Sequence, residues 1–244
     1  MIGGKHMKYA LVTGTDHGLG LALVKELLKR DYFIVACRLD SNEKQVDELL
    51  INHEERLRIL EMDIGNDHSV KMMKEKVTAW VPYIDLLINN AGILGDMDKV
   101  LGDELNYQEI LQVMNVNAVG TLRVSNALSE LVINSELKTI INISSEAGSI
   151  GDCYREGWFG YCMSKAAGNM QSVLVYNNIK KHGGRLVVMH PGHVASYMRG
   201  HLDTKANLTP KQSAEGILHT VLDTVLPVEK KPLYINYLGD RLLW

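Results

Sequence analysis

The sequence predicts a three-layer, doubly wound α/β fold with a central parallel sheet of about seven strands. Short β-rich runs that are apolar on both faces alternate with helix-length segments along the chain, and no Pro- or Ser-rich linker divides the 244 residues. Each crossover helix packs back onto the sheet, so such strands belong to a parallel sheet covered on both sides. We therefore expect one domain over residues 8–244, with residues 1–7 as a short N-terminal extension.

The expected strands follow one another at intervals that leave room for a helix between them. In chain order they are Tyr9–Val12, Phe33–Cys37, Arg58–Met62, Leu86–Ile88, Thr139–Ile143, Leu186–Met189 and Leu233–Ile235. Between the first two, Leu19–Lys29 has apolar and polar faces at helical spacing, which predicts an amphipathic helix. Gly148–Gly160 and Gly192–Asn207 are weakly periodic, so we expect loops near the functional face.

Composition narrows the class of partner. The chain has 26 basic and 29 acidic residues, interspersed along its length, so its net charge is −3. This balance favours a small-molecule partner over nucleic acid or an anionic membrane. No run approaches the 18 or so apolar residues of a membrane span, and the first six residues lack the apolar core of a secretion signal. Three cysteines without CxxC spacing suggest neither disulfides nor zinc, so a cytoplasmic location is expected. Nine histidines without an HExxH pattern predict no metal site.

A Gly-rich turn follows the first expected strand and leads into the Leu19–Lys29 helix. It consists of Thr13-Gly14-Thr15-Asp16-His17-Gly18-Leu19-Gly20. Gly14 permits a tight turn, while Gly18 and Gly20 allow close approach of backbone and helix. A pyrophosphate can then meet free N–H groups at the positive end of the helix. An ordinary Gly-rich loop is the alternative, but the position after the first strand favours a dinucleotide site.

The end of the second expected strand bears on the choice of nucleotide. An acidic residue there would bind the ribose 2′-OH, but this chain has Cys37 followed by Arg38, whose guanidinium suits a 2′-phosphate. His17 adds a second donor, and Asp40 lies too far along to act as the NAD-selecting acid. NADP(H) is therefore the preferred cofactor and NAD(H) the alternative. A solvated loop arginine is the other interpretation of Arg38.

Tyr161 and Lys165 form a candidate catalytic pair. They are four residues apart in a helical segment, so both side chains project from one helix face. An ammonium group beside a phenol favours the phenolate, so we expect Lys165 to lower the pKa of Tyr161 toward working pH, as a general acid/base requires. A surface Tyr–Lys pair is the commoner explanation of this spacing taken alone.

Together these motifs resemble those of the short-chain dehydrogenase/reductase family over nearly the whole chain, from Lys8 to the end. The motifs are, in order, Thr13–Gly20, Asp63, Asn89-Asn90-Ala91-Gly92, Asn117, Ser144-Ser145, Tyr161 with Lys165, and Pro191-Gly192. Seven motifs in the right order and on the right elements are far more specific than any one of them. The resemblance implies a Rossmann fold and an oxidoreductase.

Carried over to this chain, the resemblance implies four catalytic residues. Ser145 would hydrogen-bond the substrate oxygen, and Tyr161 would donate a proton in reduction or accept one in oxidation. Lys165 would contact the nicotinamide ribose, and Asn117 would hold a water that links Lys165 to solvent. The implied cofactor contacts are Gly14, Thr15, His17, Gly18, Leu19, Gly20, Arg38, Asp63, Ile64, Asn90, Ala91, Gly92, Tyr161, Lys165, Pro191, Gly192, Val194 and Ser196.

Some of these residues have structural alternatives. Asn117 could cap or kink its helix, Asp63 could cap the helix that begins near Asp67, and Ser144 could be the working hydroxyl in place of Ser145. Cys162, beside Tyr161, is expected to be buried and inert and not redox-active.

The chain also departs from the family pattern. Ser145 and Tyr161 are 16 positions apart, more than in many members, which indicates a small insertion within Gly151–Trp158. The spacing, with Ala36-Cys37-Arg38 and His190–Val194, resembles the C-factor/sniffer-type carbonyl reductase subgroup. His193 and Ser196 replace commoner residues, and we expect selectivity to depend on the insertion and on a lid between His193 and Asn207.

Three functions compete. The leading one is an NADP(H)-dependent reductase or dehydrogenase acting on a small carbonyl or alcohol, with NAD-linked alcohol dehydrogenation as its variant. A non-catalytic NADP(H)-binding regulator is second, although no catalytic position is lost. An epimerase or dehydratase of the extended type is third, because little chain follows Pro191. Family members often pair through helices that start near Asn106 and Phe159 here, so a homodimer or homotetramer is expected.

Overall fold

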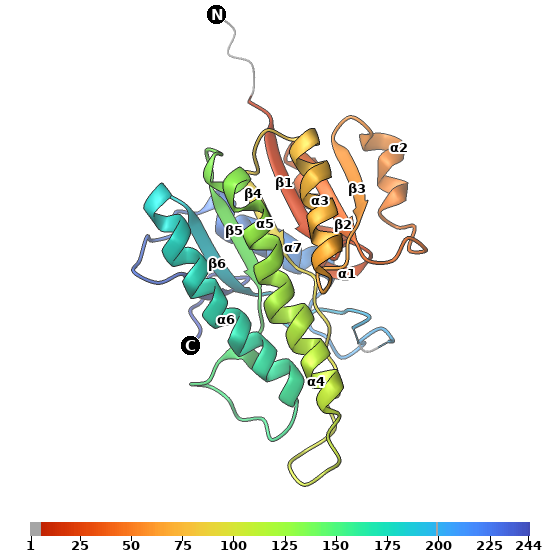
Figure 1. The fold of residues 1–244 in the computed structure, drawn as a ribbon, viewed down its shortest axis with the longest axis vertical. Helices are drawn as coiled ribbons and strands as arrows, with labels where there is room; N and C mark the ends of the chain where they lie inside the picture. Colours follow the sequence, from red (N-terminus) through yellow and green to blue (C-terminus); the bar gives the residue numbers. More distant parts are fainter. Residues whose placement is uncertain (1–5, 199) are drawn as a thin grey trace, which may run out of the picture.

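A seven-stranded, wholly parallel sheet runs through the middle of the molecule in the order β3-β2-β1-β4-β5-β6-β7. The computed structural model describes residues 6–198 and 200–244 (Figure 1). The strands are β1 Lys8–Thr13, β2 Tyr32–Arg38, β3 Leu57–Glu61, β4 Leu86–Asn89, β5 Thr139–Ile143, β6 Arg185–His190 and β7 Leu233–Asn236. All seven expected strands are present. Only β3 is displaced, ending one residue before Met62, whose N–H still bonds to Arg38 on β2.

Helices cover both faces of the sheet, which confirms the predicted three layers. They are α1 Gly18–Lys29, α2 Leu50–His53, α3 Asp67–Trp80, α4 Tyr107–Met114, α5 Thr121–Ile133, α6 Phe159–Ile179 and α7 Pro210–Leu218. Helices α1 and α7 pack in one apolar cluster, and α3, α5 and α6 contribute to the cluster on the opposite face (Figure 1). Two π-helical segments, Asn115–Gly120 and His219–Asp223, extend α4 and α7.

Successive strand residues explain why the sheet is buried on both sides. On β1, Ala10 and Val12 join the cluster of α1 and α7, while Leu11 joins the opposite one. On β2, Ile34 and Val35 divide in the same way. Side chains alternate across a strand, so continuous apolar runs need a helix layer on each face.

The carboxyl ends of the central strands gather the predicted site. From β1 the chain proceeds to β2 and β3 on one side of the sheet, and from β4 it proceeds to β5, β6 and β7 on the other side. Open α/β sheets bind ligands in the crevice at the carboxyl ends of the two strands where the direction changes, which here are β1 and β4. Just below that edge, Asn89 on β4 donates hydrogen bonds to Asn142 on β5 (2.7 Å) and to Ser125 on α5 (2.9 Å). This buried amide pair ties β4 and β5 together beneath the crevice.

The first described residues contact the side chain of Tyr83. His6 and Met7, at the end of the expected N-terminal extension, both contact the hydroxyl of Tyr83, and residues 1–5 lie outside the described residues. Across residues 6–198 and 200–244, every helix is too short or too polar to span a membrane.

Candidate active site

Ser145, Tyr161 and Lys165 come together at the carboxyl end of β5. Ser145 lies two residues after the end of the strand, whereas Tyr161 and Lys165 lie one turn apart in the first half of α6. The Lys165 Nζ is 5.5 Å from the centroid of the Tyr161 ring and donates a 3.1 Å hydrogen bond to the carbonyl of Ile143. The Ser145 side chain interacts with the Tyr161 side chain, and this interaction lowers the pKa of Tyr161.

Burial dominates the protonation of the Tyr–Lys pair. Burial raises the pKa of Tyr161 to about 12, although the interaction with Ser145 opposes the rise. Burial also lowers the pKa of Lys165 to about 8. The expectation that Lys165 lowers the pKa of Tyr161 is thus not met, because an apolar environment penalises both charged forms. Tyr161 is a neutral phenol at pH 7 and is therefore poised to donate a proton.

The two serines after β5 have different surroundings. Ser144 is buried, and its hydroxyl donates a 2.6 Å hydrogen bond to Asn169 on α6. Ser145 accepts a weaker bond from the N–H of Ala147 (3.2 Å) and faces Tyr161. The structure therefore brings Ser145, and not Ser144, to the tyrosine.

Asn117 lies in the π-helical segment between α4 and α5. Its Oδ1 accepts from the N–H of Ile93 (2.8 Å), and its Nδ2 donates to the carbonyl of Ile93 and to Ser164 on α6. The π-helical turn carries one extra residue, which directs this side chain between the β4 loop and α6. The suggestion that Asn117 kinks its helix agrees with this geometry, and the hydrogen bonds of its amide join the two elements.

The hydroxyl of Tyr234 on β7 contacts the backbone of Ser145. It donates a 2.5 Å hydrogen bond to the backbone carbonyl of Ser145, and the Tyr234 ring packs against Trp244, with 5.2 Å between centroids. Sequence reasoning missed this residue. The two partners are 89 positions apart, so no local pattern could have found the contact.

The Gly-rich turn has the close approaches expected of a phosphate cradle. A Cβ on Gly20 would lie 1.9 Å from the carbonyl oxygen of Gly14, and one on Gly14 would lie 2.8 Å from the Cα of Ala91. Gly18 has φ +57 and open space beside it. Helix α1 starts there without a side-chain cap, so its first N–H groups are free to meet an anion. These features fit a dinucleotide pyrophosphate.

The remaining residues of the turn surround this cradle. Thr15 is fully buried, its N–H bonds to the carbonyl of Cys37 on β2, and its hydroxyl has no hydrogen-bond partner among the described residues. Leu19 packs against the core on the α1 side. The His17 ring lies edge-on to Tyr197 at 5.9 Å, so the turn touches the loop after β6.

The loop after β4 links the cradle to the catalytic residues. Asn90 donates from Nδ2 to the carbonyls of Thr13 and Gly14, and the N–H of Ala91 bonds to the Thr13 hydroxyl. A Cβ on Gly92 would lie 3.7 Å from the Lys165 Nζ. This loop therefore runs from the phosphate end of the crevice to the catalytic end.

Arg38 is not the solvated loop arginine of the alternative interpretation. Its side chain is only 10% exposed, and Nη1 donates to Asp47 (2.5 Å) and to the carbonyl of Glu43. Glu61 lies 3.9 Å from Nη2. The guanidinium stands at the carboxyl end of β2 as expected, but two carboxylates already compete for it.

Asp63 does not cap the next helix. Asn66 caps α3 by accepting from the N–H of Ser69, whereas Asp63 accepts from the N–H of Gly65 (2.7 Å). Ile64 is buried, and its carbonyl accepts from Arg123. Asp63 and Ile64 directly follow Met62, just after the end of β3.

The segment after β6 forms the expected loop. Pro191 accepts from Ser213 on α7, and Gly192 has φ +82 with only 2.5 Å between a hypothetical Cβ and Leu208. Val194 pairs with Leu208 in an isolated bridge, and the carbonyl of Ser196 accepts from Asp203. His193 Nε2 lies 2.8 Å from Asp203, which closes the loop on itself. Arg199 lies outside the described residues.

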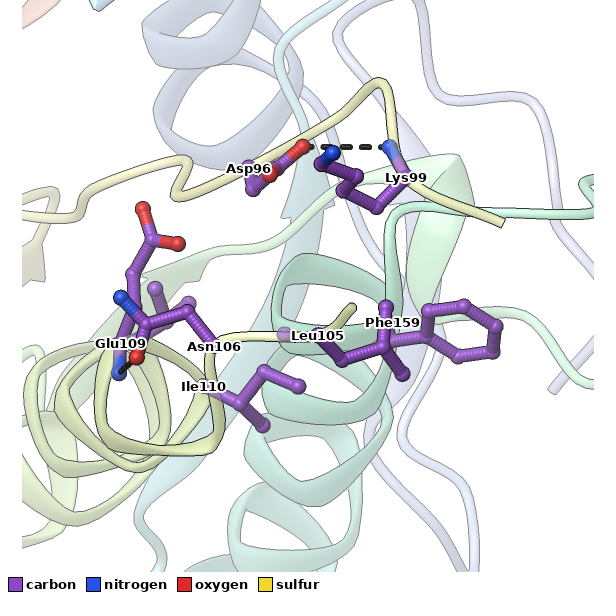
Figure 2. Close-up of a pocket in the computed structure, with 9 residues that line it drawn as sticks. Asp96, Lys99, Leu105, Asn106, Glu109, Ile110 and Phe159 are labelled. Atoms are coloured by element: carbon purple, nitrogen blue, oxygen red, sulfur yellow. Dashed lines mark hydrogen bonds between the residues drawn. The ribbon is translucent and has the colours of Figure 1, made fainter. Parts of the chain in front are cut away.

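The insertion before α6 packs against the loop that precedes α4. Val100 forms an antiparallel bridge with Gly157, and a small pocket lies nearby (Figure 2). Its lining includes Asp96, Lys99, Glu109 and Phe159. The cavity of about 20 Å³ has room for roughly one water and includes none of the catalytic residues, so it is not the substrate site.

Comparison with known proteins identifies relatives of the whole architecture. Residues 8–207 match the family model described as short chain dehydrogenase. The C-signal protein of Myxococcus xanthus is 32% identical over 161 residues, which are 66% of this chain and 93% of that protein.

Two solved structures superpose along the chain. NADPH-bound carbonyl reductase from chicken fatty liver has a TM-score of 0.86 and 28% identity, covering 98% of this chain and 100% of that one. The carbonyl reductase Sniffer of D. melanogaster has a TM-score of 0.87 and 26% identity with the same coverage. The resemblance found in the motifs thus extends to the fold and to sequence similarity.

Proposed function

The chain belongs to the short-chain dehydrogenase/reductase family, and from that premise we propose that it is an NADP(H)-dependent oxidoreductase that interconverts a carbonyl and a secondary alcohol of a small molecule. Membership makes it an oxidoreductase that acts on CH–OH and C=O groups with NAD(P). The convergence of Ser145, Tyr161 and Lys165 at one strand end is the observation that carries the proposal.

The proposed roles follow from the positions of these side chains. When bound, the nicotinamide supplies or takes up the hydride. Ser145 donates a hydrogen bond to the substrate oxygen, and Tyr161 transfers its hydroxyl proton to the oxygen as negative charge develops there. Lys165 supports the proton transfer and binds the ribose, while Asn117 keeps the β4 loop and α6 in register. The same groups act in reverse during alcohol oxidation.

The protonation state of Tyr161 supports reduction as the direction at neutral pH. A phenol whose pKa is raised to about 12 keeps its proton at pH 7 and can give it to a carbonyl oxygen. Alcohol oxidation needs the phenolate, and its rate should therefore rise with pH.

Arg38 supports NADP(H) as the preferred nucleotide. It is a largely buried cation at the end of β2, where a 2′-phosphate would bind, and the chicken carbonyl reductase was solved with NADPH. NAD(H) is the second candidate, because Asp47 and Glu61 already neutralise Arg38 and a phosphate would have to compete with them.

We also propose a homodimer or homotetramer that forms through α4 and α6. These two helices pack side by side (Figure 1), and four of their leucine and methionine side chains are more than half exposed. They are Leu111, Met163, Met170 and Leu174. Apolar side chains gathered on adjacent helices favour burial against a second copy.

A binding titration tests the proposed cofactor. Nicotinamide fluorescence is followed while NADPH or NADH is added to the wild-type protein and to Arg38→Ala. We expect NADPH to bind more tightly and that preference to be lost in the variant. Equal or NADH-biased binding by the wild type would contradict the role of Arg38, and no binding of either nucleotide would contradict the proposed function. NADPH oxidation is then assayed with aldehydes, ketones and quinones.

A further inference from the structure

In the insertion before α6, the charged side chain of Arg155 is largely buried while a neighbouring aromatic side chain is exposed. Its side chain is only 10% exposed, whereas the neighbouring Tyr154 is 76% exposed. The guanidinium carbon lies 4.6 Å from the centroid of the Tyr154 ring and 4.7 Å from that of Trp158. A planar guanidinium that stacks on two aromatic rings holds both of them in place.

Trp158 in turn contacts the catalytic tyrosine. The two rings meet edge to face with 6.3 Å between centroids. Trp158 has φ +63, a backbone conformation that side-chain-bearing residues rarely adopt, and it is the N-cap of α6. Its carbonyl accepts the N–H of Cys162, so the first turn of α6, which carries Tyr161, starts from this residue.

Glu146 connects Arg155 to the other side of the site. Its Oε1 lies 2.5 Å from the Arg155 guanidinium, and its backbone N–H faces Nδ1 of His190. Glu146 directly follows Ser145. One ion pair therefore joins the loop that carries the serine to the loop that leads to the tyrosine.

We propose that Arg155 is a positioning residue for the active site. It fixes the Trp158 ring beside Tyr161, and its positive charge offsets the negative charge of Glu146 near the Tyr161 phenol. The inference rests on the proposed function and deepens it, because it assigns to the insertion a role in orienting the proton donor.

The electrostatic part of this role has a definite sign. Besides burial and the interaction with Ser145, charge on Cys162 and Glu146 raises the pKa of Tyr161, while Arg155 lowers it. Lys165 lies over the Tyr161 ring, Tyr234 interacts with Tyr161 through charge, and His190 faces the backbone N–H of Glu146. Loss of the Arg155 cation should therefore raise the pKa of Tyr161, and loss of the Glu146 carboxylate should lower it.

Acrylamide quenching of tryptophan fluorescence tests the hold on Trp158 without any turnover. Arg155→Met and Arg155→Lys are each compared with wild type. In both, the quenching of Trp158 itself should rise several-fold, because neither side chain has the planar guanidinium that contacts both rings. The same pair of substitutions in a Trp158→Phe background should leave quenching unchanged, which assigns the signal to Trp158. Arg58→Met, which removes the arginine stacked on Phe33, is the matched control.

The pH profile of kcat/KM tests the electrostatic part. Relative to wild type, Arg155→Met should shift the Tyr161-dependent limb to higher pH, and Glu146→Gln should shift it to lower pH. Arg155→Lys keeps the charge, so its profile should stay near that of wild type even though its quenching rises. A purely structural role would move all three profiles alike or none of them.

The outcomes separate this inference from the proposed function. Unchanged quenching in Arg155→Met, or pH shifts in the same direction for Arg155→Met and Glu146→Gln, would overturn it. If the wild type reduces no aldehyde, ketone or quinone with either nucleotide, the proposed function fails, and quenching alone then decides whether Arg155 holds Trp158.

Discussion

The hydroxyl of Tyr234 donates a 2.5 Å hydrogen bond to the backbone carbonyl of Ser145. Burial raises the pKa of Tyr234 to about 12, so this hydroxyl keeps its proton and remains a donor throughout the physiological range. The loop that carries the proposed substrate-binding serine is thus fastened to β7, the last strand of the sheet.

Removing this fastening should slow turnover. Tyr234→Phe keeps the ring contact with Trp244 but frees the Ser145 carbonyl. We expect kcat to fall about tenfold and the free energy of unfolding to fall by about 1 kcal/mol, measured by steady-state kinetics and urea titration. Tyr83→Phe, far from the site, is the control. A wild-type kcat in Tyr234→Phe would show that the bond does not position Ser145.

Tyr161→Phe should abolish turnover and leave cofactor binding intact. The variant keeps the buried ring but loses the only proton that the proposed mechanism transfers to substrate, so the rate should fall about a thousandfold. Nicotinamide fluorescence measures binding, and NADPH oxidation measures turnover. Tyr176→Phe removes another hydroxyl from α6, one that bonds to Glu229, and should retain activity. Substantial residual activity in Tyr161→Phe would overturn the assigned role.

Lys165→Met should stabilise the protein at pH 7 while turnover is lost. The pKa of Lys165 is lowered from 10.5 to about 8 in the folded state. Between these values the unfolded chain binds more protons, so wild-type stability rises with pH from about 8 to 10.5, and below pH 8 the protein bears the full cost of burying the charge. After the lost bond to Ile143 is allowed for, the gain at pH 7 should be about 2 kcal/mol.

Urea unfolding of wild type and Lys165→Met at pH 7 and pH 9.5 measures this difference. The advantage of the variant should shrink at the higher pH. An advantage that grows with pH would contradict the lowered pKa.

Asp47→Asn should increase the preference for NADPH over NADH. The substitution removes the charge of the carboxylate 2.5 Å from Arg38 and leaves only Glu61, at 3.9 Å, to compete with a 2′-phosphate for the guanidinium. We expect the ratio of the two dissociation constants to shift about tenfold toward NADPH. Asp31→Asn, which breaks a distant pair with Arg56, is the control. An unchanged ratio would show that Asp47 does not compete with the phosphate.

Leu174→Lys should dissociate the proposed oligomer. The side chain lies in the exposed apolar set on α4 and α6, and a charge buried in that interface would be costly. Size-exclusion chromatography with light scattering should give the monomer mass for the variant and a larger mass for wild type. Ile51→Lys places the same charge on α2, at another exposed apolar position, and should leave the mass unaltered. A monomeric wild type would refute the interface.

The strands and the Gly-rich turn could be predicted because their signals are local. Strands β1 and β2 are buried on both faces, so their sequences are continuously apolar. The backbone of the turn approaches other atoms too closely for a side chain at Gly14 and Gly20, so the glycines themselves mark the turn in the sequence. The pairing of Tyr161 with Lys165 could be predicted for the same reason, because both lie on one helix face.

The features that sequence reasoning missed depend on contacts between distant segments. The bond from Tyr234 to Ser145 crosses 89 positions, and the competition of Asp47 for Arg38 depends on how the loop after β2 folds back. The raised pKa of Tyr161 depends on burial, which the spacing of two residues does not reveal.

The π-helical turn at Asn115–Gly120 also sets the rotational phase between α4 and α5. One residue of helix corresponds to about 100° of rotation. If one residue were deleted so that α4 and α5 formed a regular helix, Val124, Leu128 and Val132 would turn away from the sheet face that they now pack against. The core on that face therefore requires the extra residue of the π-helical segment, and the packing of α5 keeps Asn117 in its position.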